Sequence, residues 1–301
     1  MDLKSKIILI SGPTASGKSN FAIKLAKKIN GEIINADSMQ VYKELKVLTS
    51  RPVLKEQKKV KHHLYGIVSV KSKFSTGKWL KLAIKKIYEI KKKEKVPILV
   101  GGTGLYFNAL VKGLVKIPVI PMRFRNKVRA LQKYYGQKKF YYKLLKIDNK
   151  VKNKIDPNDV QRSIRAYEIK LFSKKSIYDW IKQTKPNFSD NDFFKLYINI
   201  DRENLIKKIE KRTTKMINAG AIKEVKKYRK LKISKQSSAD KVIGIKEIRE
   251  FLDKKIEIEK TKELLFIRTR QYAKRQITWS RSKMVSWIKI EPKDFQTLLK
   301  N

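Results

Sequence analysis

The sequence has 301 residues, of which 41% are hydrophobic, so the chain is long enough to form one large core or two domains. Its 74 Lys and Arg against 27 Asp and Glu give a formal net charge of +47, which attracts polyanions such as nucleic acids; a merely solvated basic surface is the alternative. The sequence has no cysteine for disulfides or thiolate metal sites, and no run approaches the roughly eighteen apolar residues that span a membrane. We therefore expect a cytoplasmic protein without a membrane contact.

The first strong motif is GPTASGKS, from Gly12 to Ser19. It follows the apolar run 7–10 and precedes a helical pattern, so it matches the phosphate-binding pattern G-x-x-x-x-G-K-[ST] between a strand and a helix. The glycines let backbone N–H groups turn toward an anion at a helix N-terminus, and Lys18 adds a full positive charge. Ser19 is placed to hold Mg²⁺ with its hydroxyl. The motif predicts a phosphate-binding loop without specifying the phosphate ester.

A second strand and an acidic residue come next. Helical spacing of apolar residues predicts a helix that ends near Asn30–Gly31, and the run 32–35 reads as a buried strand. In an open parallel sheet, side chains that follow the carboxyl ends of strands face the ligand crevice. We therefore expect Asp37 to lie near the phosphate loop. A capping role in a turn or at a helix start is the alternative for this carboxylate.

The chain has only two histidines, His62 and His63. Neighbours in a strand point to opposite faces, so these two cannot bind one metal there, and we expect them to be packed or hydrogen-bonded. Further on, a helical pattern over 78–93 leads into the buried strand 96–100. A second glycine-rich turn, 101–106, follows that strand, where backbone can approach a ligand closely. Alone, this turn is a weak indication of a site.

The pattern changes near Pro118, where prolines break the alternation of strands and helices. The residues that follow are basic, aromatic and mostly helical in pattern, and the run 195–200 reads as a returning strand. We therefore predict an α/β fold with a P-loop and a three-layer parallel sheet, formed by residues 1–117 and 196–301, and an inserted helical domain at 118–195. Within the insertion, a helix entry near Asp159 would place Arg162 and Arg165 on one face.

The last strong feature is a helix from about 261 to 280. Leu265, Tyr272 and Trp279 recur on one face, and three basic residues, Arg270, Lys274 and Arg281, project from roughly the opposite face. Such a helix can pack with one side and bind phosphates with the other. A solvated basic face is the alternative.

A phosphate loop near a carboxylate suits two kinds of chemistry. In a kinase, the loop holds ATP and Asp37 activates a hydroxyl or water for attack on phosphorus. In a transferase that acts at carbon, the loop holds a pyrophosphate leaving group and Asp37 accepts a proton from the attacking amine. The residues alone leave both open, together with a nonenzymatic RNA-binding protein.

Six segments together identify a resemblance. In chain order they read GPTASGKS (12–19), NADSMQVYK (35–43), HHL (62–64), VGGTGLY (100–106), DVQRSIRA (159–166) and TRQYAKRQITW (269–279). In this order they resemble the bacterial tRNA dimethylallyltransferases over nearly the whole chain. The second of these segments, with its DSMQ sequence, and the last are not shared by P-loop kinases generally. The sequence departs from the family pattern at 47–52, where an IGTAKP-like run is typical, and at Ile245, where tyrosine is typical.

The resemblance implies transfer of a dimethylallyl group from dimethylallyl diphosphate to the exocyclic amine of the adenosine just 3′ of the anticodon, with Mg²⁺ as cofactor. It implies catalytic roles for Asp37, Lys18 and Thr103, with Asp37 as the general base. The residues that would hold the diphosphate are Gly12, Pro13, Thr14, Ala15, Ser16, Gly17, Lys18 and Ser19. The residues that would contact the anticodon stem-loop of tRNA are Asp37, Ser38, Met39, Gln40, Thr103, Arg125, Gln161, Arg162, Ser163, Ile164, Arg165, Lys274, Arg275 and Gln276. No protein partner is implied, and we expect a monomer.

Overall fold

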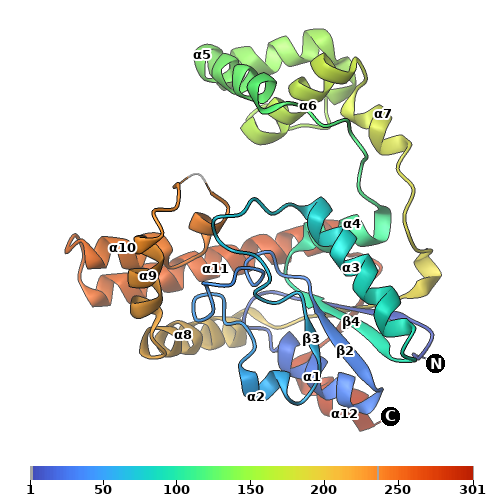
Figure 1. Ribbon diagram of the computed structural model, residues 1–301, viewed down its shortest axis with the longest axis vertical. Helices are drawn as coiled ribbons and strands as arrows, with labels where there is room; N and C mark the ends of the chain where they lie inside the picture. The colour runs from blue at the N-terminus through green and yellow to red at the C-terminus, as the bar shows by residue number, and fades with distance from the viewer. Residues whose placement is uncertain (1–2, 236, 301) are drawn as a thin grey trace. The chain divides into compact units, whose positions relative to one another are not determined.

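The computed structural model describes residues 3–235 and 237–300. Within these residues the core is one six-stranded sheet in which all pairings are parallel, with the strand order β3-β2-β4-β1-β5-β6 (Figure 1). The strands are β1 (Ile7–Ser11), β2 (Gly31–Asn35), β3 (His62–His63), β4 (Val96–Gly101), β5 (Phe193–Ile198) and β6 (Ile288–Ile290). Because the strands are parallel, their carboxyl ends meet along one edge, where ligand sites form in such sheets.

Helices cover both faces of this sheet (Figure 1). On one face, α1 (Lys18–Lys28) and α12 (Phe295–Lys300) lie against the strands, and Phe21 of α1 packs with Ile8 and Ile10 in one buried cluster. Alternate strand residues point to the other face, which is covered by α3 (Thr76–Lys91) and α4 (Gly104–Lys112). There Trp79 and Tyr106 stack with ring centroids 4.1 Å apart. The core therefore has three layers.

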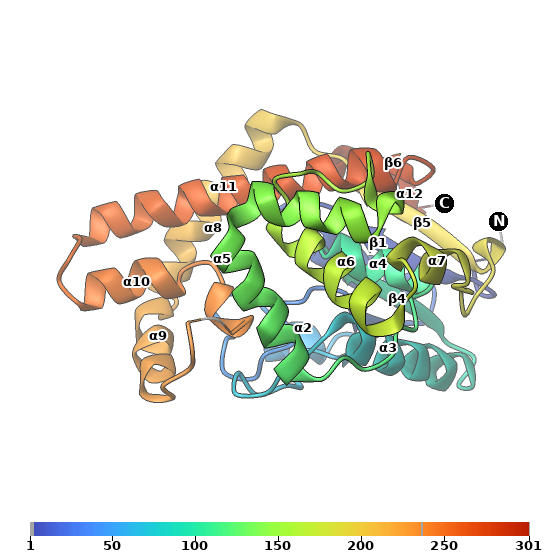
Figure 2. The same ribbon diagram turned by 90° about the horizontal axis from the view of Figure 1, so that it is seen from above.

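A helical lobe continues from the sheet. It contains the helices α8 (Arg202–Asn218), α9 (Ala221–Lys230), α10 (Ile245–Leu252) and α11 (Ile258–Lys283), whereas the short helix α2 (Leu54–Gln57) lies between β2 and β3 in the chain. Its apolar core joins α9 and α10 to the loop that follows β2, through buried residues such as Leu45, Val225 and Ile248. The long helix α11 packs on α10, packs on α8 through residues that include Ala273, and extends toward the sheet (Figures 1 and 2).

Residues Lys112–Asn187 form a separate compact unit. It consists of α5 (Met122–Ile147), α6 (Val160–Ser173) and α7 (Ile177–Lys182), and α5 and α6 lie side by side (Figure 2). Gly136 interrupts α5 with φ 68°, a left-handed conformation that favours glycine. Phe140, Leu144 and Val151 are fully buried within this unit, so it has a hydrophobic core of its own. Short 3₁₀ turns complete the chain at Asn149–Val151, Asp190–Asp192, Ala239–Lys241 and Pro292–Asp294.

The predicted fold class, a P-loop α/β sheet with an inserted helical domain, is confirmed. The boundaries of the insertion differ from the predicted 118 and 195, because the compact unit runs from Lys112 to Asn187. On the N-terminal side α4 ends before Gly113, whose φ is 83°, so the chain leaves the core earlier than the prolines indicate. On the C-terminal side Phe193 and Phe194 already pair with β1, so they belong to the sheet.

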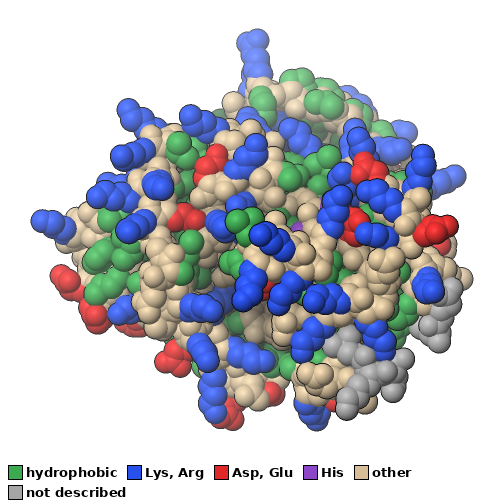
Figure 3. Space-filling model, turned by 60° about the horizontal axis from the view of Figure 1, so that its bottom comes forward, with side chains coloured by type: hydrophobic (Ala, Val, Ile, Leu, Met, Phe, Trp, Pro, Cys, Tyr) green, Lys and Arg blue, Asp and Glu red, His purple; other side chains and the backbone are tan. Residues whose placement is uncertain are grey.

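Positive charge is spread over the surface. Figure 3 shows Lys and Arg side chains over most of one face, with few acidic side chains between them. A search of the described helices finds none that is both long and apolar enough to cross a membrane. Charge alone therefore does not locate a binding site on this protein.

Candidate active site

The phosphate motif forms the loop between β1 and α1, as predicted. Ala15 and Gly17 have left-handed backbone conformations, with φ of 65° and 91°. Such conformations curve a loop so that successive backbone N–H groups face its concave side, where an anion can bind. No side chain caps the N-terminus of α1, so the first N–H groups of this helix are available to an anion. Ser16 is fully buried, and its hydroxyl has no hydrogen-bond partner among the described residues. The loop is built to receive additional hydrogen-bonding groups.

Two cations from distant parts of the chain share this region. Lys18 donates to the Pro13 carbonyl at 3.0 Å. Burial is the main reason that the pKa of Lys18 falls to about 8; the Asp37 carboxylate opposes this shift and the Arg212 guanidinium adds to it. Burial also lowers the pKa of Arg212, which stays charged at any ordinary pH, and Arg212 Nε has no hydrogen-bond partner among the described residues. Two desolvated cations thus lie near one carboxylate.

Asp37 follows β2 and takes part in a tight turn. Its Oδ1 accepts a hydrogen bond from the Met39 N–H at 2.9 Å, and its own N–H donates to Asn35 Oδ1 at 2.8 Å. The capping role considered as an alternative is therefore present. The carboxylate also acts electrostatically on the site, because its charge opposes the fall in the pKa of Lys18 and of Arg212. Asp37 combines a fixed position with an influence on both cations.

Thr103 connects the second glycine-rich turn to the segment after Asp37. Its Oγ1 accepts from the Ser38 N–H at 2.9 Å and donates to Ser38 Oγ at 3.2 Å. It also bonds with the hydroxyl of Tyr272 from α11. Burial, aided by the Asp37 charge, raises the pKa of Tyr272, so this phenol stays protonated. The carboxyl ends of β2 and β4 therefore meet α11 at Thr103.

A cavity of about 250 Å³ lies where these segments meet. Residues from the ends of β1, β2, β4 and β5 and from α11 line it: Ser11, Gly12, Ser38, Met39, Gly102, Thr103, Gly104, Tyr197, Tyr272, Arg275, Gln276, Trp279, Ser280 and Met284. The hydroxyl-bearing residues Ser38 and Thr103 and the aromatic residues Tyr272 and Trp279 are among them, and Gly12 also belongs to the phosphate loop. Such a cavity can hold a planar, polar-edged group beside a bound phosphate.

A model of the IPP transferase family matches residues 40–283 of this chain. The chain belongs to this family. It is similar to a tRNA dimethylallyltransferase of Pelagibacter ubique (strain HTCC1062), with 64% identity over 97% of this chain and 93% of that protein, and to one of Rickettsia felis (strain ATCC VR-1525 / URRWXCal2), with 43% identity over 92% and 90%.

Solved structures give the same result. A tRNA delta(2)-isopentenylpyrophosphate transferase of Staphylococcus epidermidis is 32% identical, with a TM-score of 0.69 and coverage of 98% of this chain and 96% of that one. A eukaryotic dimethylallyltransferase described as acting on tRNA is 30% identical, with a TM-score of 0.83 and coverage of 95% and 73%. The resemblance seen in the six motifs is thus confirmed.

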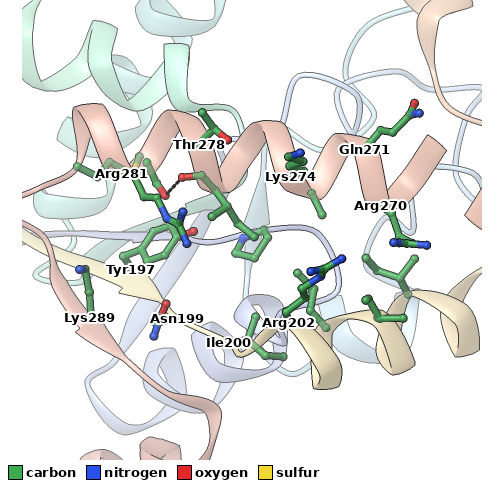
Figure 4. A pocket seen from close by; sticks show the side chains of 18 of the residues that line it. Tyr197, Asn199, Ile200, Arg202, Arg270, Gln271, Lys274, Thr278, Arg281 and Lys289 are labelled. Carbon is green, nitrogen blue, oxygen red and sulfur yellow. Dashed lines mark hydrogen bonds between the residues drawn. The ribbon is translucent and has the colours of Figure 1, made fainter. Parts of the chain in front are cut away.

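A second and larger cavity, of about 780 Å³, lies along α11 near α8 and Pro13 (Figure 4). Arg202, Arg270, Lys274, Arg281 and Lys289 are among its lining residues. These five cations are a quarter of the twenty lining residues, and Lys and Arg are also about a quarter of the chain, at 74 of 301. The cations of this cavity therefore do not by themselves mark a specific anion site.

Not all residues expected at the site lie there. The Gln40 amide donates to the carbonyls of Thr49 and Ser50, at 2.9 and 3.3 Å, so it stabilises the segment 47–52 rather than lining the smaller cavity. Lys274 lines the larger cavity, whereas Arg275 and Gln276 line the smaller one. The sequence pattern does not separate these neighbours, because adjacent helix residues point in different directions.

The two departures from the family pattern have structural roles. The Glu224 carboxylate accepts from the N–H groups of Lys46, Val47 and Leu48, at 2.7, 2.8 and 2.9 Å, and so fixes the start of the segment 47–52. Ile245 is fully buried in the apolar core of the lobe, which has no need for a hydroxyl there.

Within the insertion the expected RNA-contacting residues divide into three groups. Gln161 and Arg162 are exposed on α6. Ser163 and Ile164 are buried in the unit, so their side chains pack inside it rather than lie on its surface. Arg125 Nε and an Arg165 nitrogen lie 3.1 and 3.3 Å from Glu168 Oε2. These two arginines therefore already have an internal partner.

Arg212 was missed in the sequence. Leu205, Ile209 and Met216 indicate the buried face of α8, and position 212 falls on the same face by helical spacing. A charge on an apolar face is a recognisable signal, because a buried cation without a partner is costly unless a ligand supplies the opposite charge. Arg212 was overlooked because only the apolar residues of this helix were used to define its buried face.

The two histidines have the structural roles that were expected. His63 Nε2 is 2.6 Å from Glu32 Oε2, and His62 Nδ1 is 2.7 Å from the Val60 carbonyl. In the described part of the chain no group of three or more His, Asp or Glu could hold a metal ion. Mg²⁺ usually binds to proteins through few side chains and several substrate phosphate oxygens, so the single hydroxyl of Ser19 beside a phosphate loop fits such an ion.

Proposed function

We propose that this chain transfers a dimethylallyl group from dimethylallyl diphosphate to the exocyclic amine of the adenosine 3′-adjacent to the anticodon of tRNA, with release of pyrophosphate. Membership of the IPP transferase family makes the chain a prenyltransferase that modifies tRNA. The observation that supports the residue assignments is that Lys18, Arg212 and Asp37 influence one another electrostatically, while Gly12 of the phosphate loop and Ser38, the neighbour of Asp37, line the smaller cavity together with Thr103. The proposed place of work is the cytoplasm, where tRNA is found, and the proposed working form is a monomer.

The diphosphate would lie on the N–H groups of the loop 12–19, with Lys18 and Arg212 facing its negative charge. As the carbon–oxygen bond breaks, charge develops on the leaving pyrophosphate. Cations that are already desolvated stabilise that charge strongly, because little water has to be displaced when it forms. Ser19 would hold Mg²⁺ together with diphosphate oxygens, and the ion supplies further neutralisation of the leaving group when bound.

The target adenine would enter the cavity of about 250 Å³ beside Ser38, Met39 and Thr103. An exocyclic amine on an aromatic ring is a weak nucleophile. As the new nitrogen–carbon bond forms, the amine loses a proton, and Asp37 would accept it as general base. Because a stacked base cannot reach such a cavity, the adenosine must turn out of its stack, and Trp279 and Tyr272 offer aromatic surfaces for it.

RNA binding would use exposed cations that position the anticodon arm without reading its sequence. In the insertion, Gln161 and Arg162 are the exposed residues of the motif, and in the core Lys274 and Arg275 lie on α11. Arg125 and Arg165 would support this surface through Glu168.

The test uses purified protein with Mg²⁺, dimethylallyl diphosphate and unmodified tRNA that has adenosine next to the anticodon. We expect release of pyrophosphate and a mass increase of that one nucleoside by a dimethylallyl group. The matched control is the same tRNA with another base at that position. Absence of the alkylated nucleoside contradicts the proposal, and ATP consumption without tRNA would indicate a phosphotransferase instead.

A further inference from the structure

One side chain of α11 joins the two glycine-containing turns of the site. Gln276 Oε1 accepts a hydrogen bond from the N–H of Thr14 in the phosphate loop, at 2.8 Å. Its Nε2 donates to the carbonyl of Gly102 in the second turn, at 2.9 Å. A single amide therefore ties α11 to the carboxyl ends of β1 and β4.

The second turn is shaped to admit this contact. A Cβ atom at Gly102 would lie 2.0 Å from Gln276 Nε2, and one at Gly104 would lie 2.2 Å from the ring of Trp279. Neither distance is possible for real atoms. A side chain at Gly102 would displace the Gln276 amide and one at Gly104 would displace the Trp279 ring, so the two glycines permit the close approach of α11.

The face of α11 that carries Gln276 also forms one wall of the smaller cavity, of about 250 Å³, in which the acceptor base would lie. Tyr272, Arg275, Gln276 and Trp279 occupy positions that share one side of a helix, and all four line the cavity. Tyr272 also reaches the hydroxyl of Thr103. The wall against which the acceptor base would lie is thus held in place by a hydrogen bond to the donor loop.

We propose that Gln276 is a positioning residue that couples the phosphate loop 12–19 (the donor loop) to the α11 face that lines the smaller cavity (the acceptor wall). As a result, a bound diphosphate changes the affinity of the protein for RNA, and bound RNA changes its affinity for the diphosphate. The identity of these two ligands rests on the proposed function. The N–H groups of the loop are the groups that bind phosphate, so a bound diphosphate competes for or reorients the Thr14 N–H. This change is transmitted through the Gln276 amide to α11. By thermodynamic reciprocity, RNA that holds α11 must alter the affinity of the loop by the same factor.

This role differs from the direct RNA contact that the resemblance implies for Gln276. Both ends of the amide already bond to the main chain of the protein. A direct contact would contribute to RNA affinity whether or not diphosphate is bound. A positioning residue contributes chiefly to the ratio of the affinities measured with and without the second ligand.

The experiment measures this ratio without turnover. Inorganic pyrophosphate with Mg²⁺ is the donor probe, and unmodified anticodon stem-loop RNA is the acceptor probe; pyrophosphate has no prenyl group to transfer. The dissociation constant of pyrophosphate is measured by calorimetry with and without saturating RNA. We expect the wild-type ratio to depart from one by about fivefold or more, the lower end of typical coupling.

Gln276→Leu keeps the size of the side chain but neither hydrogen bond. In this variant we expect the ratio of the pyrophosphate dissociation constants with and without RNA to lie within about twofold of one, which is less than typical coupling. The RNA affinity measured alone should stay the same. Gly102→Ala, whose Cβ would displace the Gln276 amide from its hydrogen-bonded position, should lose the coupling as well. Gln271→Leu is the matched control, because its exposed amide is on α11 but bonds to neither loop, and it should keep the wild-type ratio.

A wild-type ratio of one, or an unchanged ratio in Gln276→Leu, overturns the proposal. So does a fall in RNA affinity alone with the coupling preserved, because that result assigns Gln276 to direct contact. These outcomes are separate from failure of the proposed function, since pyrophosphate and RNA binding can be measured even if the wild-type protein alkylates no tRNA.

Discussion

Asp37→Asn is the sharpest test of the site, because it removes a charge and keeps the shape of the side chain. The amide oxygen of asparagine can still accept from the Met39 N–H, so the turn after β2 is preserved. The amide cannot accept a proton from the attacking amine. Loss of a general base lowers a rate by about 10²–10⁴, which corresponds to about 2.7–5.4 kcal/mol at 1.36 kcal/mol for each tenfold step. We therefore expect a fall in kcat of this size with RNA affinity nearly unchanged.

The same substitution has a second effect through Lys18. The pKa of Lys18 is about 8, and the Asp37 charge is the influence that holds it up. At this pKa about nine-tenths of Lys18 is protonated at pH 7 and about one-tenth at pH 9, so pyrophosphate affinity should fall as the pH rises through about 8. Without the Asp37 charge, burial and Arg212 act unopposed and the pKa falls further. The midpoint of pyrophosphate binding should therefore move to lower pH in Asp37→Asn.

The rate assay is single-turnover formation of the modified nucleoside. Pyrophosphate binding in the presence of Mg²⁺ is measured by calorimetry from about pH 6.5 to 9.5, a range of about one unit or more on each side of the Lys18 pKa. Asn35→Asp is not a suitable control because its side chain bonds within the same turn, so the control is Asp201→Asn, a capping carboxylate at the start of α8. A wild-type rate in Asp37→Asn refutes its role as base. A pH midpoint that stays fixed or moves upward refutes the electrostatic assignment.

Three further substitutions test other parts of the structure. Arg212→Met should lower kcat by about 10²–10³, the usual loss for one charge-stabilising group. Because Arg212 lowers the pKa of Lys18, the same substitution should move the pH midpoint of pyrophosphate binding upward, opposite to Asp37→Asn, and an unmoved midpoint contradicts this. Arg162→Ala should weaken tRNA binding and reduce its salt slope by about one, with pyrophosphate affinity unchanged, and an unaltered slope counts against a phosphate contact. Glu168→Gln should destabilise the inserted unit by about 1–3 kcal/mol in urea unfolding, because two guanidinium groups lose their buried partner, and wild-type stability would show that Arg125 and Arg165 need no partner.

The sheet was predictable where buried strands are apolar runs bounded by glycine or by a polar turn. The strands β1, β2 and β4 are of this kind, and their burial on both faces explains why no alternation is visible. The strand β6 has only three residues, and two of them are exposed, so its place in the sheet depends on pairing with β5 rather than on its own pattern. Local sequence cannot show such a strand, because the stabilising partner is distant in the chain.

The phosphate loop and Asp37 were predictable because each follows a strand that the sequence itself reveals. The bridging role of Gln276 was not, since it depends on how α11 packs above the sheet, whereas Arg212 left a signal in the sequence as a cation on the apolar face of α8. The expected RNA segment Gln161–Arg165 was accurate as part of a helix, but helical periodicity places Ser163 and Ile164 on its buried side. A motif specifies which residues are close in sequence, and only packing decides which of them face outward.

The number of cations on this protein says less than their burial and their partners. Exposed lysines and arginines attract tRNA from every direction, so they raise the encounter rate without fixing a register. Lys18 and Arg212 differ because burial lowers the pKa of both. Two desolvated cations beside one carboxylate destabilise the folded protein by themselves, and an added diphosphate offsets that cost. Arg125 and Arg165 share the single negative charge of Glu168 within their own unit, so both have an internal ionic partner. Burial close to the phosphate loop, rather than the presence of a cation, therefore distinguishes Lys18 and Arg212 from the many other cations of this protein.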